Sequence, residues 1–237
     1  MRAFFQEDLS KDTISLSSEE SKHITKSLRA MEGEFIWITD GKGLLAKAEI
    51  TTIFRDVCTV EIRERIFHDN ATFKQLHLAV APTKNLDRME WLVEKAVEIG
   101  VAQISFIICD RSERKYIDHN RLLRISIAAL KQSQGVWLPK LRTIPFLQFI
   151  IETRATVADK FIAYCGENKD SIAINLINYQ QTTAIFLIGP EGDFTPQEFL
   201  TAKESGFQPI SLGEKILRTE TAALFATCSF AIFAPQK

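Results

Sequence analysis

The sequence predicts a chain of two domains, a small β-rich domain followed by an α/β domain with a mostly parallel sheet. A polar break at residues 68–71 separates two stretches of different pattern. Before the break, apolar runs flank the glycine-rich turn Asp40–Gly43, as in a β-hairpin. After it, apolar strands alternate with amphipathic helices, which is the pattern of a parallel sheet. We therefore place the domains at residues 1–70 and 71–237.

In the first domain, residues 35–39 and 44–50 are expected to form the two strands of the hairpin. Residues 53–66 alternate apolar and polar side chains, which indicates a further strand pair or one long strand. The sheet of this domain should therefore be mostly antiparallel.

A helix is expected before the hairpin, where Ser17 and Glu20 have the spacing of a capping box. Three basic side chains share one face of this helix at positions i, i+4 and i+7: Lys22, Lys26 and Arg29. Such a face either is solvated or contacts RNA phosphates.

The second domain contains eleven expected elements. Its strands are predicted at residues 76–81, 104–109, 140–144, 161–165, 184–188 and 209–212. Its helices are predicted at residues 85–99, 118–134, 146–153, 196–205 and 219–233. Gly100 ends the first of these helices, because glycine adopts a positive φ without strain.

Composition excludes several classes of protein. The net charge of −1 disfavours a general nucleic-acid binder, so an RNA partner would contact a local footprint. The longest nearly uncharged stretch, residues 224–235, is shorter than the roughly 20 residues of a membrane helix, so we expect a cytoplasmic protein that does not contact membranes. The four cysteines lie far apart and without ligand spacing, which indicates reduced thiols and no metal site.

Two glycine-bearing loops mark the expected ligand site. Residues 189–192, Gly-Pro-Glu-Gly, follow a predicted strand, and Gly213 follows the last one. Ligands of open parallel sheets bind at the carboxyl ends of strands, where glycine lets the backbone approach closely. Neither common phosphate-binding signature is present, which favours a ligand whose adenine and ribose are held by backbone groups.

The two loops carry a specific resemblance. Residues 188–192 and 212–222, Ile-Gly-Pro-Glu-Gly and Leu-Gly-Glu-Lys-Ile-Leu-Arg-Thr-Glu-Thr-Ala, resemble the paired signature of the 16S ribosomal RNA uridine-N3 methyltransferases, which belong to the SPOUT class. Further matches extend over the chain: Lys84, Trp91, Lys95, Glu98–Val101, Arg111, Ser112, Gln132, Ser133 and Pro139. The sequence departs from the family at Asp193, often glycine, and at Gly135, commonly arginine.

The resemblance implies a trefoil-knotted methyltransferase domain, an N-terminal RNA-binding barrel of PUA type, and S-adenosyl-L-methionine as cofactor. The expected cofactor residues come from both loops: Leu187, Ile188, Gly189, Pro190, Glu191, Gly192, Ser211, Leu212, Gly213, Ile216, Leu217, Thr219 and Thr221. The two loops would together enclose one cofactor.

Arg218 and Glu220 are the candidate catalytic residues. A fixed guanidinium at Arg218 would stabilise negative charge developing on uracil, or would instead form an ion pair with Glu191 or Glu220 that locks the loops. Glu220 would orient Arg218 or accept the proton of the base. Thr219 and Thr221 would cap the terminal helix or contact the cofactor.

The implied partners are 16S ribosomal RNA in the small ribosomal subunit and a second copy of the chain. The candidate RNA contacts are Arg2, Lys22, Lys26, Arg29, Lys84 and Arg111. The terminal helix is apolar nearly all round, which indicates burial on more than one side and suggests a homodimer interface. The alternative to an enzyme is a non-catalytic ribosomal RNA-binding assembly factor that retains the cofactor fold.

Overall fold

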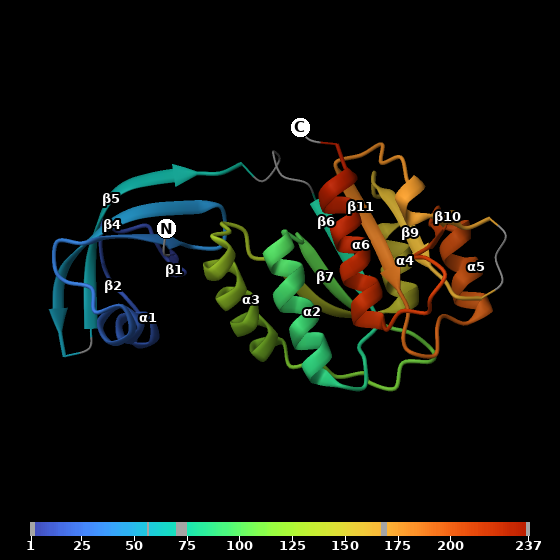
Figure 1. The fold of residues 1–237 in the computed structure, drawn as a ribbon, viewed down its shortest axis with the longest axis horizontal. Helices are drawn as coiled ribbons and strands as arrows, with labels where there is room; N and C mark the ends of the chain where they lie inside the picture. Colours follow the sequence, from blue (N-terminus) through green and yellow to red (C-terminus); the bar gives the residue numbers. More distant parts are fainter. Residues whose placement is uncertain (1–2, 56, 70–74, 167–169, 236–237) are drawn as a thin grey trace. The chain divides into compact units, whose positions relative to one another are not determined.

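The structure of the chain is a computed structural model, which describes residues 3–55, 57–69, 75–166 and 170–235. Two compact units are present (Figure 1), the first formed by residues 1–70 with 127–138 and the second by residues 71–126 with 139–237. The boundary expected at residues 70 and 71 lies outside the described residues.

The first unit contains a five-stranded sheet in the order β1-β3-β4-β5-β2. Its strands are β1 (Ala3–Phe5), β2 (Thr13–Ser15), β3 (Phe35–Thr39), β4 (Leu44–Phe54) and β5 (Val57–Phe67). All neighbouring strands are antiparallel except β1 and β3, which run parallel.

Glycines form the turn between β3 and β4, as the sequence predicts. Gly41 and Gly43 have φ values of 68° and 99°, which side chains rarely adopt. The following strands differ from the prediction for residues 53–66, because β4 continues to Phe54 and β5 begins only at Val57. The alternation of apolar and polar side chains continues from one strand into the next. The sequence pattern therefore does not locate the point where β4 ends and β5 begins.

The predicted helix at residues 17–29 is only partly α-helical. Helix α1 covers Ser18–Lys22, and a π-helical segment, η1, covers His23–Leu28. Arg29 then has a left-handed φ of 52°, so the three basic residues do not lie along one α-helical face. The side chain of Ser17 caps α1 by accepting from the backbone N–H of Glu20.

Glu20 does not complete the predicted capping box. Its buried carboxylate instead accepts a hydrogen bond of 2.6 Å from Lys131 Nζ. Residues 136–138 also pair with the glycine turn, because Gly43 N–H donates to Val136 O and Leu138 N–H donates to Gly41 O. Residues 127–138 therefore belong structurally to the first unit.

The second unit is built on a seven-stranded, fully parallel sheet in the order β10-β12-β9-β11-β6-β7-β8. Its strands are β6 (Gln75–Val80), β7 (Gln103–Ile108), β8 (Lys140–Pro145), β9 (Asp159–Ala163), β10 (Ile172–Ala173), β11 (Thr183–Ile188) and β12 (Gln208–Ser211). The six predicted strands are confirmed within a few residues, and β10 is additional.

Helices cover both faces of this sheet. The helices of this unit are α2 (Leu86–Ile99), α4 (Phe146–Thr153), α5 (Pro196–Glu204) and α6 (Thr219–Phe233), with a 3₁₀ turn, η3, at Ile174–Leu176. Helix α3 (His119–Ser133) begins in the second unit, and its residues from 127 onward belong to the first. Figure 1 shows α2 and α6 side by side in front of the sheet and α4 behind it. Apolar side chains such as Phe149, Phe194 and Phe207 fill the core on the side of α4 and α5.

Individual elements follow from the sequence signals. Gly100 ends α2 with a φ of 100°, as predicted. Thr195 and Glu198 form a complete capping box at the start of α5, with Pro196 at its first position. Helix α6 has the predicted bounds.

Candidate active site

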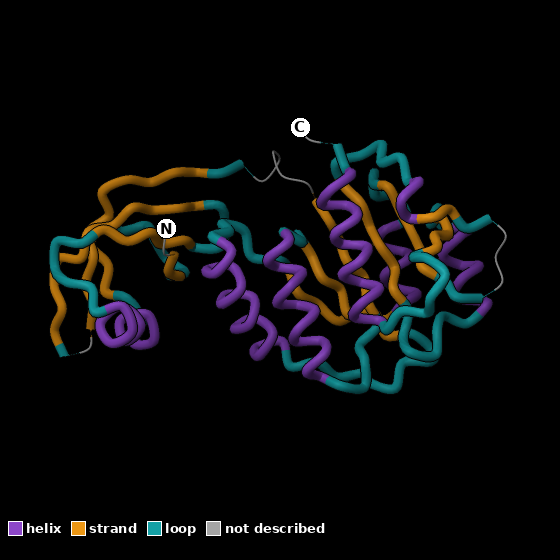
Figure 2. The backbone as a smooth tube through the Cα atoms, viewed as in Figure 1, coloured by secondary structure: helices purple, strands orange, loops and turns teal. Residues whose placement is uncertain are grey.

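The candidate site lies at the carboxyl edge of the parallel sheet of the second unit. All seven strands are parallel, so the loops that follow them leave along the same edge. Figure 2 shows loops gathered at the lower edge of this unit. The loops after β6, β7, β9 and β11 are connected to one another by hydrogen bonds.

The loop after β11 begins at a glycine that packing requires. A Cβ atom at Gly189 would lie 3.1 Å from the ring of Phe194 and 3.2 Å from its backbone nitrogen. The loop then turns back on itself, because Asp193 N–H donates to Pro190 O over 2.9 Å. Glycine at position 189 therefore allows the tight fold of this loop.

The two sequence motifs lie together at the start of α6. Thr219 is buried, and its hydroxyl donates a hydrogen bond of 3.1 Å to Gly189 O. Residues that are 30 positions apart thereby join the loop after β11 to the first turn of the terminal helix. The trefoil threading implied by the resemblance remains a prediction.

The expected cofactor residues differ in exposure. Five are buried: Leu187, Ile188, Gly189, Pro190 and Thr219. Three are half-buried: Ser211, Leu212 and Leu217. Five are exposed: Glu191, Gly192, Gly213, Ile216 and Thr221. The side chain of Ile216, at 87% exposure, adds apolar surface to the second loop.

Lys84, an expected RNA contact, lies beside the cofactor loop. Its backbone N–H donates to Glu191 Oε1 over 3.0 Å, and its Nζ lies 3.1 Å from Glu113 Oε2. Arg114 holds the same segment by donating to Lys84 O. Backbone contacts therefore fix Lys84 at the site, while its side chain remains exposed.

Arg111, another expected RNA contact, holds the cofactor loop. Its Nη1 donates to Gly192 O over 2.8 Å and to Phe194 O over 3.3 Å. A guanidinium that bridges two carbonyl groups restricts the backbone between them. Arg111 therefore positions the loop after β11, a role that the sequence does not indicate.

The first unit contains the other expected RNA contacts. Lys22, Lys26 and Arg29 are exposed on α1 and η1. Arg2 lies outside the described residues. The first unit thus presents basic side chains to solvent on one short helical segment.

The candidate catalytic residues lie at the start of α6. Arg218 is the exposed N-cap residue, and no ion pair involves it among the described residues. The two carboxylates that were expected as ion-pair partners of Arg218 contact other residues. Glu191 accepts from the backbone N–H of Lys84, and Glu220 Oε1 lies 3.6 Å from Arg88 Nε. Arg88, on α2, is a site residue that no local sequence signal indicates.

Glu220 has unused hydrogen-bonding capacity. Its side chain is 8% exposed, and its buried Oε2 has no hydrogen-bond donor in the described part of the chain. A buried carboxylate oxygen without a donor is energetically costly. Glu220 therefore retains an acceptor oxygen that is buried in the first turn of α6.

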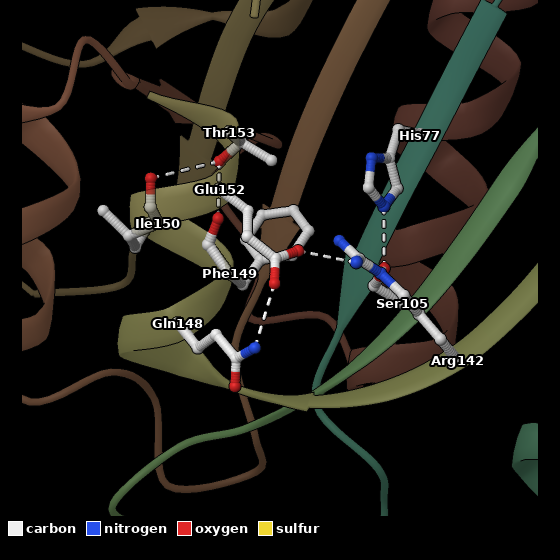
Figure 3. A network of polar contacts seen from close by, with 8 residues as sticks. All are labelled: His77, Ser105, Arg142, Gln148, Phe149, Ile150, Glu152 and Thr153. Atoms are coloured by element: carbon white, nitrogen blue, oxygen red, sulfur yellow. Dashed lines mark hydrogen bonds and ion pairs between the residues drawn. The ribbon is translucent and has the colours of Figure 1, made fainter. Parts of the chain in front are cut away.

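A second polar cluster lies on the face of the sheet that α4 covers (Figure 3). Ser105 Oγ accepts from Arg142 Nε over 2.9 Å and lies 2.8 Å from His77 Nε2. Arg142 also donates to Glu152 on α4, and Gln148 donates to the same carboxylate. Burial, with the nearby charge of Arg142, lowers the pKa of His77 to about 3.

Two further features of the described residues bear on the class of protein. No group of His, Cys, Asp or Glu side chains is arranged to hold a metal ion in the parts of the chain that the structure describes. Across the same residues, no helix combines the length and apolarity needed to span a bilayer.

Family models match both parts of the chain. A model described as an RNA methyltransferase domain matches residues 70–231, and one described as an RNA methyltransferase PUA domain matches residues 16–63. With the parallel sheet and its joined loops, these matches define the class: an RNA methyltransferase with an N-terminal PUA domain.

The relatives identify the family within this class. The ribosomal RNA small subunit methyltransferase E of Mesomycoplasma hyopneumoniae is 30% identical over 95% of this chain and 96% of its own. The chain belongs to the family of ribosomal RNA small subunit methyltransferases E.

Solved structures agree with this assignment. A probable rRNA-methyltransferase from Porphyromonas gingivalis is 38% identical, with a TM-score of 0.87 and coverage of 96% of both chains. A ribosomal RNA small subunit methyltransferase E from Neisseria gonorrhoeae, bound to S-adenosyl methionine, is 27% identical, with a TM-score of 0.83 over 99% of this chain and 98% of its own. The predicted SPOUT-type α/β fold with a PUA-like domain is confirmed.

Proposed function

We propose that the protein transfers a methyl group from S-adenosyl-L-methionine to N3 of a uridine in 16S ribosomal RNA of the small subunit. The observation that carries the proposal is the hydrogen bond from Thr219 to Gly189 O, which joins the two motif loops. A similar protein has been solved with S-adenosyl methionine bound. On this proposal, residues 1–70 form the RNA-binding domain and residues 71–237 the methyltransferase domain, except that residues 127–138 belong structurally to the first unit.

The cofactor would lie between the loop after β11 and the loop after β12. The residues fit such a ligand, because Gly192 and Gly213 expose backbone without a side chain and Leu212, Ile216 and Leu217 supply apolar surface. When bound, the cofactor supplies an electrophilic methyl group on a sulfonium. The protein's contribution is then orientation and electrostatics.

Arg218 and Glu220 would act on the uracil. N3 of uridine carries a proton that must leave as the N3–CH₃ bond forms. Glu220 Oε2, which has no donor among the described residues, would accept this proton. The exposed guanidinium of Arg218 would face the carbonyl oxygens of the base and stabilise the charge that develops on them.

RNA binding and dimerisation complete the proposal. Arg2, Lys22, Lys26 and Arg29 would contact phosphate groups from the first unit, with Lys84 and Arg111 beside the cofactor loops. Side chains of α6 that the single chain leaves exposed would form the interface of a homodimer. Modification of ribosomal RNA would take place in the cytoplasm.

The decisive experiment incubates undermethylated small subunits with the protein and labelled S-adenosyl-L-methionine, and then maps the labelled nucleoside. The expected product is 3-methyluridine. Label on another base would contradict the substrate assignment, and cofactor binding without any transfer would favour the non-catalytic assembly factor.

Arg218→Ala separates the proposed catalytic role from a structural one. Methylation should fall about a hundredfold or more, the loss typical of one preorganised electrostatic group, while cofactor affinity changes by less than about tenfold. Calorimetry and single-turnover methylation measure the two quantities. Equal losses of both would make Arg218 a structural residue.

A further inference from the structure

Asp193 occupies a backbone conformation that suits glycine. Its φ is 61°, in the left-handed region that glycine adopts without strain. Aspartate is among the few other residues that adopt this conformation, because its short side chain can hydrogen-bond locally.

The side chain of Asp193 connects two loops of the candidate site. Its Oδ2 accepts a hydrogen bond of 2.9 Å from the backbone N–H of Cys165, in the loop after β9. Its Oδ1 accepts one of 2.8 Å from the N–H of Phe194. Strands β9 and β11 are neighbours, so one carboxylate ties together the loops at the ends of two adjacent strands.

A second side chain holds the same loop from the opposite direction. Arg111, in the loop after β7, donates to the carbonyl oxygens of Gly192 and Phe194, the residues on either side of Asp193. Two groups thus fix the backbone at position 193. The guanidinium of Arg111 binds the carbonyl oxygens of the two adjacent residues, and the carboxylate of Asp193 itself binds the N–H groups of Cys165 and Phe194.

The charged and titratable groups that face Asp193 are Arg111 and Cys165. Burial raises the pKa of the Asp193 carboxyl above 3.8, and the hydrogen bonds and Arg111 oppose this only in part. Burial, together with the negative charge of Asp193, raises the pKa of the Cys165 thiol.

We propose that the ionised carboxylate of Asp193 is a positioning group that holds residues 189–194 in the conformation that binds S-adenosyl-L-methionine. This inference rests on the proposed function, in which these residues form one wall of the cofactor site. Its hydrogen bond from Cys165 N–H joins the loop after β11 to the loop after β9, and its hydrogen bond from Phe194 N–H fixes the backbone that follows position 193. Loss of the carboxylate therefore weakens cofactor binding.

Two substitutions test the proposal. Asp193→Gly keeps the left-handed backbone without strain and removes both hydrogen bonds. Asp193→Asn tolerates the same backbone, but its amide NH₂ cannot accept from an N–H, so at most one of the two bonds remains. Thermal unfolding of each variant shows whether it is folded before binding is compared.

The measurement is calorimetric titration with S-adenosyl-L-methionine near neutral pH. Each variant should bind about tenfold more weakly than the wild type, as expected for lost hydrogen bonds to a charged group. Folded variants that bind like the wild type would overturn the inference. A wild type that binds no cofactor would instead overturn the proposed function.

Cys165 provides a readout that is independent of the cofactor. It is the exposed one among the four cysteines. Removing the nearby negative charge favours the thiolate, so Asp193→Gly should react faster with iodoacetamide near neutral pH. The same measurement with Cys165→Ser, made in the wild type and in Asp193→Gly, gives the reaction of the other thiols, which is then subtracted. An unchanged rate would show that the carboxylate does not act on Cys165.

Discussion

His77 is a half-buried, neutral imidazole on the interior strand β6, between Ser105 and the ring of Phe149. In the folded chain its pKa is about 3, whereas in the unfolded chain it has the ordinary value of 6.5. Between these values the unfolded chain binds a proton and the folded chain does not. The contribution of His77 to stability is thus complete above about pH 6.5 and is lost as the pH falls toward about 3.

We expect acidification from about pH 7 to about pH 5 to lower the free energy of unfolding through this residue by on the order of 2 kcal/mol. His77→Gln should remove this part of the pH dependence, because glutamine does not titrate. Urea unfolding of both proteins at the two pH values measures the difference. Equal pH dependence in the two proteins would show that His77 titrates normally when folded.

Arg111 gives a second prediction at the scale of single residues. Arg111→Met keeps most of the side-chain length but removes the donor to the carbonyl groups of Gly192 and Phe194, so cofactor affinity should fall about tenfold. Arg124→Ala, at an exposed arginine on α3, is the control and should bind the cofactor like the wild type. If Arg111 served only RNA binding, its substitution would weaken RNA binding alone.

Helix α6 illustrates what an element contributes. Its bounds follow from the sequence. The prediction that it is buried on more than one side is only partly correct for the single chain, because three large apolar side chains are exposed. Phe225, Ile232 and Phe233 are 47%, 70% and 60% exposed. Phe225 and Ile232 are seven residues apart and therefore share one face of the helix. Trp91, on the neighbouring α2, is also exposed.

This exposed face predicts the oligomeric state. Light scattering should find the wild type as a dimer, and Phe225→Glu should give a monomer, because a carboxylate in an apolar interface loses its hydration. Leu200→Glu, at an exposed leucine on α5, is the control and should remain dimeric. A monomeric wild type would remove the proposed interface.

The element at residues 18–28 shows where sequence patterns stop being informative. Ile24 and Leu28 are four residues apart, and a seam this short does not distinguish α-helical from π-helical hydrogen bonding. The Ser17 cap is local and was therefore predictable. The partner of Glu20 is Lys131, 111 residues away, and no local pattern reveals such a contact.

At the scale of the molecule, periodicity predicted the parallel sheet and the helix order, because each strand and helix carries its own apolar pattern. The motif residues pointed to the loops at the carboxyl edge. The contact between Arg88 and Glu220 and the clamp made by Arg111 could not be predicted, since both join loops or helices that are distant in sequence. The strand order itself also depends on contacts between distant segments.

The segment at residues 127–138 has a consequence for dividing the chain. Trp137 packs so closely on Gly43 that a side chain at position 43 could not be accommodated. A fragment of residues 1–70 lacks this tryptophan and leaves the buried Glu20 carboxylate without Lys131. We expect circular dichroism to show that this fragment is unfolded, and that adding residues 127–138 through a short linker restores its β-structure. A folded 1–70 fragment would contradict this.

The first unit is thus discontinuous in sequence, even though the family models match the chain as two successive blocks. An insertion or a deletion between residues 70 and 127 would change the covalent distance between two parts of one folding unit. Exchange of N-terminal modules between relatives should therefore succeed only when residues 127–138 are exchanged together with them, since Gly41 and Gly43 contact Val136, Trp137 and Leu138.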